Sequence, residues 1–258
     1  MFMRRDGMVI ARVAEGVHWH ALDDDEVVGR GYALHRPDGR VFLSVDSWQD
    51  DVFHRLADAM LADLPAPVYT VVDDDDREVL ARWQGVGFVP HRREREYVVP
   101  TDPATTGLDR PPPPGVTVLP VGQAAEAPLR ALDQALRDEV GPVGWQSMPA
   151  EVLVRPDGSG GVFDPSRYAV AVRDGRYVGL ARVAPLPRRP RLGLLAVRTD
   201  HRRLGIARAM LTEVLGSLHR SGIAELSTEV DEDNAPALAL FESAGARHLR
   251  DAVELLHT

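Results

Sequence analysis

The 258-residue sequence contains no cysteine. This absence excludes disulfide bonds, thiolate zinc sites and covalent catalysis through a protein sulfur. Long apolar runs are also absent, since no stretch approaches the roughly 20 residues that a membrane-spanning helix needs. The short apolar run at residues 8–10 is followed by Arg12 and Glu15, which interrupt any signal-peptide core. We therefore expect a cytoplasmic protein without a membrane partner.

An excess of basic residues is missing as well. The formal net charge is -9, with 30 Lys and Arg against 39 Asp and Glu. Nucleic-acid-binding surfaces concentrate positive charge to displace counterions, so we expect no nucleic-acid partner. A composition of 44% hydrophobic and 27% charged residues is typical of a globular protein, and the length favours two domains.

A proline-rich segment divides the chain. Residues 99–115 (VPTDPATTGLDRPPPPG) contain six prolines and no apolar periodicity, which is typical of an extended linker. We predict one domain at residues 1–99, a linker at 100–114 and a second domain at 115–258.

The second domain alternates strand and helix patterns. Asp174-Gly175 joins two alternating apolar runs and predicts a hairpin. Gly222 and Gly245 each follow an apolar helical stripe as C-terminal caps. The pattern predicts a mixed α/β sheet flanked by helices. Its strands are expected at residues 115–121, in the two runs of 167–186 that Asp174-Gly175 joins, and at 191–197 and 224–230. Its helices are expected at 123–138, along the apolar face 207–218 that Gly222 follows, and between a cap at Asn234 and Gly245.

The first domain repeats part of this order. Residues 26–35 resemble 177–185, residues 41–45 resemble 194–197, and residues 81–88 resemble 240–246. A divergent tandem copy explains these matches, and an unrelated small α/β domain is the alternative.

The stretch LLAVRTDHRRLGIARAM, residues 194–210, carries an anion-site pattern. An apolar strand ends in a turn with Arg202, Gly205 and Ala207 and continues as an amphipathic helix. Small residues let phosphate oxygens approach the unpaired N–H groups of the first helical turn, where the helix dipole is positive. Alternatively, Gly205 only eases the turn and the arginines form a solvated face.

Together with VDEDNAPALALFESAGA, residues 230–246, this stretch resembles the GCN5-related N-acetyltransferase (GNAT) family. The resemblance covers residues 115–258 and implies acetyl-CoA as co-substrate, with no metal. It implies that the N–H of Val197 donates to the thioester carbonyl. It implies a cofactor-binding set of Leu195, Val197, Arg202, Arg203, Leu204, Gly205, Ile206, Ala207, Arg208, Asn234 and Phe241.

Two positions depart from the family pattern. Phe241 stands where many members carry a tyrosine that protonates the departing thiolate, and phenylalanine cannot donate a proton. The alternative role for Phe241 is to pack its helix onto the sheet. No carboxylate occupies residues 191–194, so we name Glu229 as the general base, with Asp231, Glu139 and Glu151 behind it.

The first domain is expected to bind no CoA. Asp50 and Asp51 stand where its corresponding helix begins, and they would repel a pyrophosphate.

Three other features of the sequence are weighed as sites. Trp145, in the second domain, is either an aromatic wall for the acceptor or a core anchor. The pair His18 and His20 lacks further metal ligands nearby in the sequence, and residues 73–76 lack the glycine of a calcium loop.

These observations favour an acetyltransferase with a tandem arrangement and a degenerate N-terminal copy. Its substrate would be a primary amine of a small molecule or peptide. A CoA-binding sensor or scaffold without chemistry is the alternative, motivated by Phe241. N-myristoyl or aminoacyl transfer on the same fold is a third possibility.

Overall fold

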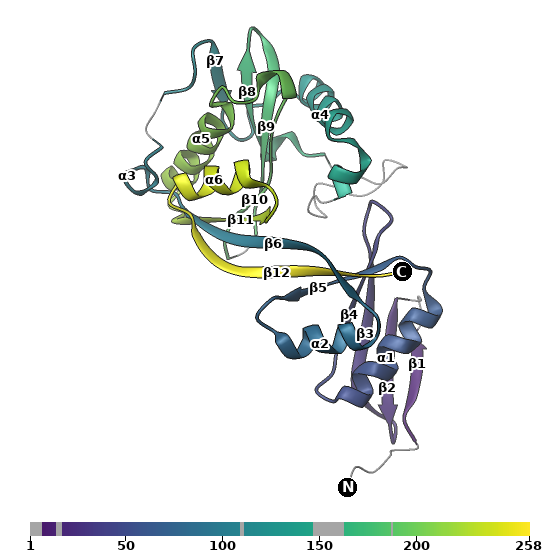
Figure 1. Ribbon diagram of the computed structural model, residues 1–258. Coiled ribbons are helices and arrows are strands. Elements are labelled where there is room, and N and C mark those ends of the chain that lie inside the picture. Colours follow the sequence, from purple (N-terminus) through teal and green to yellow (C-terminus); the bar gives the residue numbers. More distant parts are fainter. Residues whose placement is uncertain (1–6, 14–16, 109–110, 147–162, 187) are drawn as a thin grey trace. The chain divides into compact units, whose positions relative to one another are not determined.

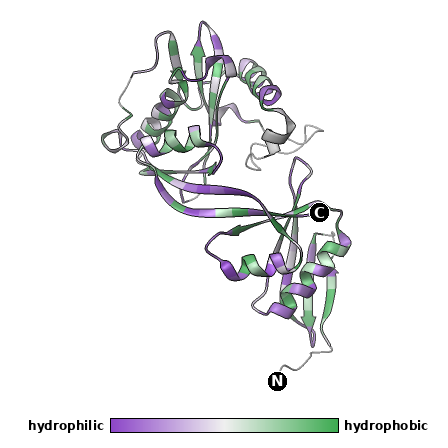
Figure 2. Cartoon of the chain, in the orientation of Figure 1, coloured by the Kyte–Doolittle hydropathy of each residue, from purple (hydrophilic) through white to green (hydrophobic). Residues whose placement is uncertain are grey.

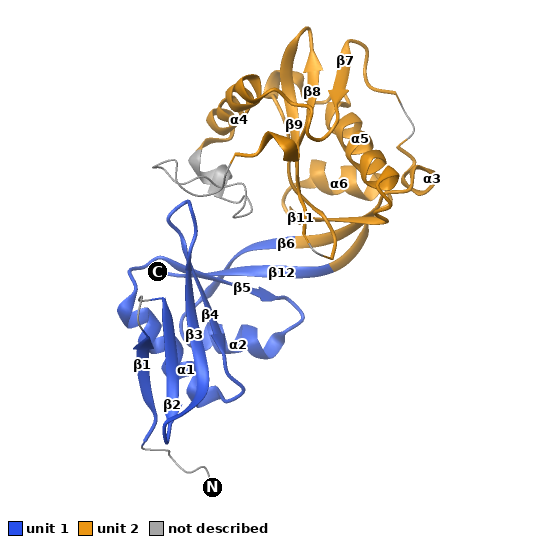
Figure 3. Ribbon diagram, turned by 180° about the vertical axis from the view of Figure 1, so that it is seen from behind, with its two compact units in different colours: residues 1–94, 250–258 blue, residues 95–249 orange. Residues whose placement is uncertain are grey.

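The computed structural model describes residues 7–13, 17–108, 111–146, 163–186 and 188–258. It divides into two compact units (Figure 3). Unit 1 comprises residues 1–94 and 250–258, and unit 2 comprises residues 95–249. In the part of the chain that the structure describes, no helix is long and apolar enough to cross a membrane.

Unit 1 is a sheet with two helices. Its hydrogen-bonded order is β1-β2-β3-β4-β5-β12. β4 and β5 are parallel, and the pairs β1-β2, β2-β3, β3-β4 and β5-β12 are antiparallel. The elements are β1 Val9–Val13, β2 His18–Asp23, β3 Glu26–His35, β4 Val41–Asp46, α1 Asp50–Asp63, β5 Val68–Asp73, α2 Arg77–Gly85, β6 Val89–Pro100 and β12 Arg247–His257.

The two helices of unit 1 share one core with one face of the sheet. Hydrophobic and hydrophilic residues alternate along α1 and α2, as amphipathic helices require (Figure 2). The close approach of α1 explains two glycines of β3, because a Cβ at Gly29 or Gly31 would lie within 2.6 Å of side chains of α1. The core includes Trp19, Phe53, Met60, Trp83, Phe88 and Leu255.

Unit 2 has the order β6-β11-β10-β9-β8-β7. β10 and β11 are parallel, and the pairs among β7, β8, β9 and β10 are antiparallel. The elements are α3 Pro103–Thr106, β7 Val116–Leu119, α4 Glu126–Gln146, η1 Pro165–Arg167, β8 Tyr168–Arg173, β9 Arg176–Ala184, β10 Arg191–Val197, η2 Thr199–His201, α5 Ile206–Arg220, β11 Glu225–Asp231 and α6 Ala235–Ser243.

Both faces of the unit 2 sheet are covered (Figure 1). Leu192, Val197, Leu226 and Val230 share a core with α5 and α6, on what we call the α5 face. The opposite α4 face carries a second core, which includes Leu129, Leu132, Leu136, Tyr168, Val170, Leu180 and Leu194. Because β10 has a register shift between Leu192 and Leu194, Leu192, Leu195 and Val197 all face α5.

The two halves repeat the same order of elements. The series β2-β3-β4-α1-β5-α2-β6 corresponds to β8-β9-β10-α5-β11-α6-β12. Each series ends in a long strand, yet β5 has β12 as its neighbour and β11 has β6. Unit 1 is therefore completed by the last strand of the second series, and unit 2 by the last strand of the first.

This arrangement differs from the boundaries expected at 1–99, 100–114 and 115–258. Residues 250–258 lie with unit 1, and the expected linker begins inside β6, which runs to Pro100, and contains the short helix α3. The charged sequence of β6 (VPHRREREYVVP) reads as polar, but Arg92 forms a 3.4 Å ion pair with Glu254 of β12. Cross-strand charge pairs of this kind make such a sequence compatible with a sheet.

Several expected elements are present. Asp174 and Gly175 both have positive φ, 51° and 73°, as the turn of a two-residue hairpin requires. Gly222 and Gly245 follow the ends of α5 and α6 with φ of 77° and 72°. The mixed α/β fold with flanking helices is confirmed.

Candidate active site

The site predicted from residues 194–210 lies where β10 and β11 separate. The two strands pair at Arg191 and Ser227, and the N–H of Ser227 donates to the carbonyl of Pro190 at 2.9 Å. The hydroxyl of Thr228 adds a bond to the carbonyl of Leu192 at 3.1 Å. Beyond Leu192 the described residues show no further backbone pairing between these strands. The edge of β10 that follows is therefore left open.

The open edge of β10 consists of the backbone N–H and C=O groups of Leu195 and Val197. The N–H of Arg198 donates to the carbonyl of Val178 in β9 at 2.9 Å. Because successive peptide groups of a strand point in opposite directions, the N–H and C=O groups of Leu195 and Val197 point away from β9. The carbonyl of Val197 accepts a 3.1 Å hydrogen bond from Nε of Arg202. An extended ligand could pair with this edge as a short added strand.

The turn after β10 presents backbone N–H groups without a competing side chain. Gly205 is the N-terminal cap of α5 with φ of 84°, and no side chain caps this helix. Arg203 also has positive φ, 63°. In the described part of the chain, the neighbour of a Cβ placed at Gly205 is Cγ of Pro113 at 3.5 Å, an ordinary contact distance, so the residues described leave this side of the turn loosely packed. An anion can therefore reach the first N–H groups of α5.

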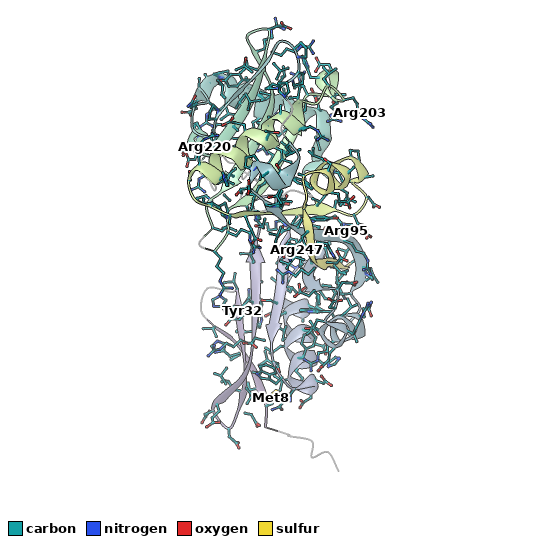
Figure 4. The ribbon with its side chains drawn as sticks, turned by 90° about the vertical axis from the view of Figure 1, so that its left-hand side faces the viewer. Met8, Tyr32, Arg95, Arg203, Arg220 and Arg247 are labelled. Carbon is teal, nitrogen blue, oxygen red and sulfur yellow. The ribbon has the colours of Figure 1, made fainter. Side chains whose placement is uncertain are left out.

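The predicted cofactor residues fall into three groups around this turn. Arg202, Arg203, Leu204 and Gly205 are exposed, and Arg203 extends outward in Figure 4. Ile206 is buried and Ala207 packs on the same core, so these two residues would bind a phosphate through their backbone N–H groups. Nη2 of Arg208 donates to the hydroxyl of Ser243 at 3.2 Å.

Asn234 and Phe241 both lie on α6. Oδ1 of Asn234 accepts from the N–H of Ala237 at 3.2 Å, which makes Asn234 the N-terminal cap. Phe241 is 4% exposed and belongs to the core of the α5 face. This placement fits the packing interpretation of Phe241, and its contact with a cofactor stays a prediction.

The proposed base, Glu229, lies on the α4 face of β11. Leu226 and Val230 face α5, so Glu229 alternates to the other side. Its two carboxylate oxygens accept from Nη1 of Arg191 at 3.0 and 3.1 Å. Asp231 lies two residues further along, and its Oδ1 accepts from the N–H of Asp233 at 2.9 Å. Glu151 lies outside the described residues, and nothing is described of the Trp145 side chain.

Glu139, one of the lower-ranked candidate bases, is held by the residues that follow β10. Its Oε2 accepts from the N–H and the hydroxyl of Thr199, both at 2.8 Å, and Oε1 contacts Arg198. Burial by itself would raise the pKa of Glu139, but the bonds from Thr199 and Arg198 outweigh it and lower the pKa. The carboxylate thus ties α4 to the chain that leads into the Gly205 turn.

Sequence reasoning missed Arg182. This residue stands in the middle of β9 and is 6% exposed, and its side chain lies on the α4 face beside Tyr168. The signal was a single charged residue inside the otherwise apolar run YVGLARVAPL.

The two strands that separate after one pair and the uncapped helix N-terminus place an open strand edge beside an anion-binding turn. Residues 136–246 match the model described as the acetyltransferase (GNAT) family, so this segment is similar to that family. The curated relatives include the [ribosomal protein bS18]-alanine N-acetyltransferase of Escherichia coli strain K12, which is 43% identical over 51 residues. That match spans 20% of this chain and 34% of the relative, about a third of its length.

Solved structures share the fold over nearly the whole chain. A GCN5-related N-acetyltransferase from Sphaerobacter thermophilus has a TM-score of 0.68 at 20% identity and covers 93% of this chain and 80% of its own. A tandem GNAT protein from the clavulanic acid biosynthesis pathway has a TM-score of 0.65 at 14% identity, covering 98% and 84%. The tandem arrangement is confirmed, and because the family model matches only the second half, the first is the degenerate copy.

Proposed function

We propose that unit 2 transfers an acetyl group from acetyl-CoA directly to a primary amine of a small molecule or peptide. The observation that carries this proposal is Gly205, in the left-handed conformation at an uncapped helix start and directly after a strand with an open edge. The uncapped N–H groups that follow Gly205 are donors of the kind that bind a pyrophosphate. Acetyl-CoA would supply the acetyl group as an activated thioester.

The chain's own groups have separate tasks in this reaction. The N–H groups from Arg202 to Ala207 and the exposed arginines hold the phosphates. The N–H of Val197 donates to the thioester carbonyl, where negative charge develops as the amine adds, and such a donor is worth about 3 kcal/mol. Glu229 takes the proton that the amine nitrogen loses as the C–N bond forms. The C–S bond then breaks, and solvent protonates the thiolate because Phe241 cannot.

The alternative is a CoA-binding sensor without chemistry. Phe241 is the observation that favours it, since this buried side chain offers no proton. The two functions predict the same acetyl-CoA binding and differ in thiol release when an amine is added.

The test begins with calorimetric titration of acetyl-CoA. We expect one site per chain in the wild-type protein and loss of that site in Gly205→Asp, whose carboxylate would repel the pyrophosphate. Gly222→Asp is the matched control, because Gly222 has a similar φ, 77°, at the other end of α5, with open space around it. Equal binding by both variants would contradict the site. Thiol release with a panel of amines then separates transferase from sensor.

A further inference from the structure

The α4 face of unit 2 holds a buried cation. Arg182 lies in β9 between Tyr168 of β8 and Leu194 of β10, which are its register partners. Leu180, two residues earlier, packs in the α4 core, and Ala181 and Val183 face α5. Arg182 therefore projects into the α4 face from β9, an inner strand of the unit 2 sheet, and 6% of it is exposed.

No carboxylate of the described part of the chain forms an ion pair with this guanidinium, whose hydrogen-bond partner is the neutral side chain of Tyr168. Its Nη1 is buried and has no hydrogen-bond partner among the described residues. Asp133, a buried acid of α4, is bound by Nε of Arg137 at 2.7 Å. Burial raises the pKa of Tyr168 although Arg182 opposes that shift, so the phenol stays neutral and supplies no negative charge.

A buried charge that no opposite charge pairs costs several kcal/mol, so a bound anion would stabilise this position. A guanidinium presents planar donors that match a carboxylate, and a single arginine balances a single negative charge. A monovalent carboxylate therefore fits this position better than a phosphate.

The position of Arg182 relates this charge to the acyl-transfer strand. Its register partner Leu194 directly precedes Leu195, whose backbone points to the open edge of β10. Glu229, the proposed base, lies on the same face of the sheet. An acceptor held by Arg182 would thus lie on the face that carries the base, along the strand that carries the proposed thioester donor.

We propose that Arg182 binds the carboxylate of the acceptor, so that the substrates of unit 2 are amines that carry a carboxylate, such as amino acids or short peptides. This proposal rests on the proposed acetyl transfer. Arg182 is a specificity-determining residue and takes no part in the bond changes.

The experiment measures thiol release at saturating acetyl-CoA with matched probes. The probes are the common amino acids and dipeptides, each paired with its carboxamide. We expect kcat/KM for the best carboxylated probe to exceed that for its amide at least tenfold. Arg182→Met should remove this preference through KM, with the acetyl-CoA affinity unchanged. Arg182→Lys should keep part of the preference for the carboxylated probe, because lysine keeps the positive charge. Arg176→Met, an exposed arginine of the same strand, should keep all of it.

Thermal unfolding of the free protein gives an independent readout. Arg182→Met removes an unbalanced buried charge, so its Tm should rise, whereas loss of a structural contact would lower it. A lower Tm, or amides acetylated as well as acids by the wild-type protein, overturns the carboxylate site and leaves acetyl transfer intact. Binding of acetyl-CoA without thiol release from any amine overturns the transfer, and the carboxylate site with it.

Discussion

Arg191 and Glu229 form an ion pair across β10 and β11 at the point where these strands still pair. The pair fixes the carboxylate in one orientation, which a general base needs, and it also gives Glu229 a structural role. A carboxylate has about four acceptor positions, so Arg191 leaves room for a proton from an amine or a water. The pH dependence of the reaction separates the catalytic from the structural role.

We expect Glu229→Gln to lower kcat/KM about 100-fold at pH 7, the size typical of a lost general base. The loss should shrink as the pH approaches the pKa of the amine, since an amine that is already deprotonated needs no base. Glu225→Gln is the control, because Glu225 lies four residues earlier in β11 and therefore on the same face of the strand. If both variants behave alike across the pH range, Glu229 is a structural partner of Arg191.

The lowered pKa of Glu139 predicts a pH-dependent stability. Because its pKa is lower in the folded than in the unfolded protein, its contribution is present above the unfolded pKa, about 4.3, and is lost as the pH falls through the folded pKa. Glu139→Gln should cost about 1 kcal/mol in urea unfolding at pH 7, and the difference should disappear at lower pH. Glu126→Gln, an exposed pair with Arg130 on the same helix, should cost little at either pH.

At the scale of elements, local chemistry determined what could be predicted. The hairpin at Asp174-Gly175, the cap at Asn234 and the turn at Gly205 depend on neighbouring residues, and each lies where the sequence indicated. β6 and β12 were not predicted, because their partners are distant: Ala252 pairs with Asp73. Arg182 was missed for the same reason, since only its surroundings on β8 and β10 distinguish it from an ordinary strand residue.

The cap of α6 provides a test of the double role of Asn234. Asn234→Ala should cost about 1 kcal/mol of stability because Ala237 loses its acceptor. Asn234→Ser keeps a capping oxygen and should keep the stability. If the amide also contacts the cofactor, acetyl-CoA binding to the serine variant should weaken about fivefold, the effect of one hydrogen bond. Unchanged affinity would make Asn234 a cap alone.

At the scale of the whole molecule, the exchange of last strands joins the two series of elements. β12 forms six register pairs with β5, from Ala252 with Asp73 to His257 with Val68. Val253 and Leu255 are fully buried in the core of unit 1. Residues 1–99 therefore lack a strand of their own sheet, and the degenerate half depends on the half with the proposed site for its stability.

Leu255→Ala tests this dependence. The cavity should destabilise unit 1 by about 3 kcal/mol, within the range for buried leucines. Fluorescence should report it, because Trp19 and Trp83 lie in the same core. Leu256→Ala, on the partly exposed side of the same strand, should cost less than half as much. Equal losses would mean that β12 contributes little to the core of unit 1.

The exchanged strands also set an order of events during synthesis. The first 94 residues of unit 1 leave the ribosome well before its last strand, since residues 95–249 are made in between. At about 5–20 residues per second this takes roughly 10–30 s. During this interval β5 has an unpaired edge, and the nascent chain must be kept from pairing with other chains. Translation speed across residues 95–249 should therefore influence the yield of folded protein.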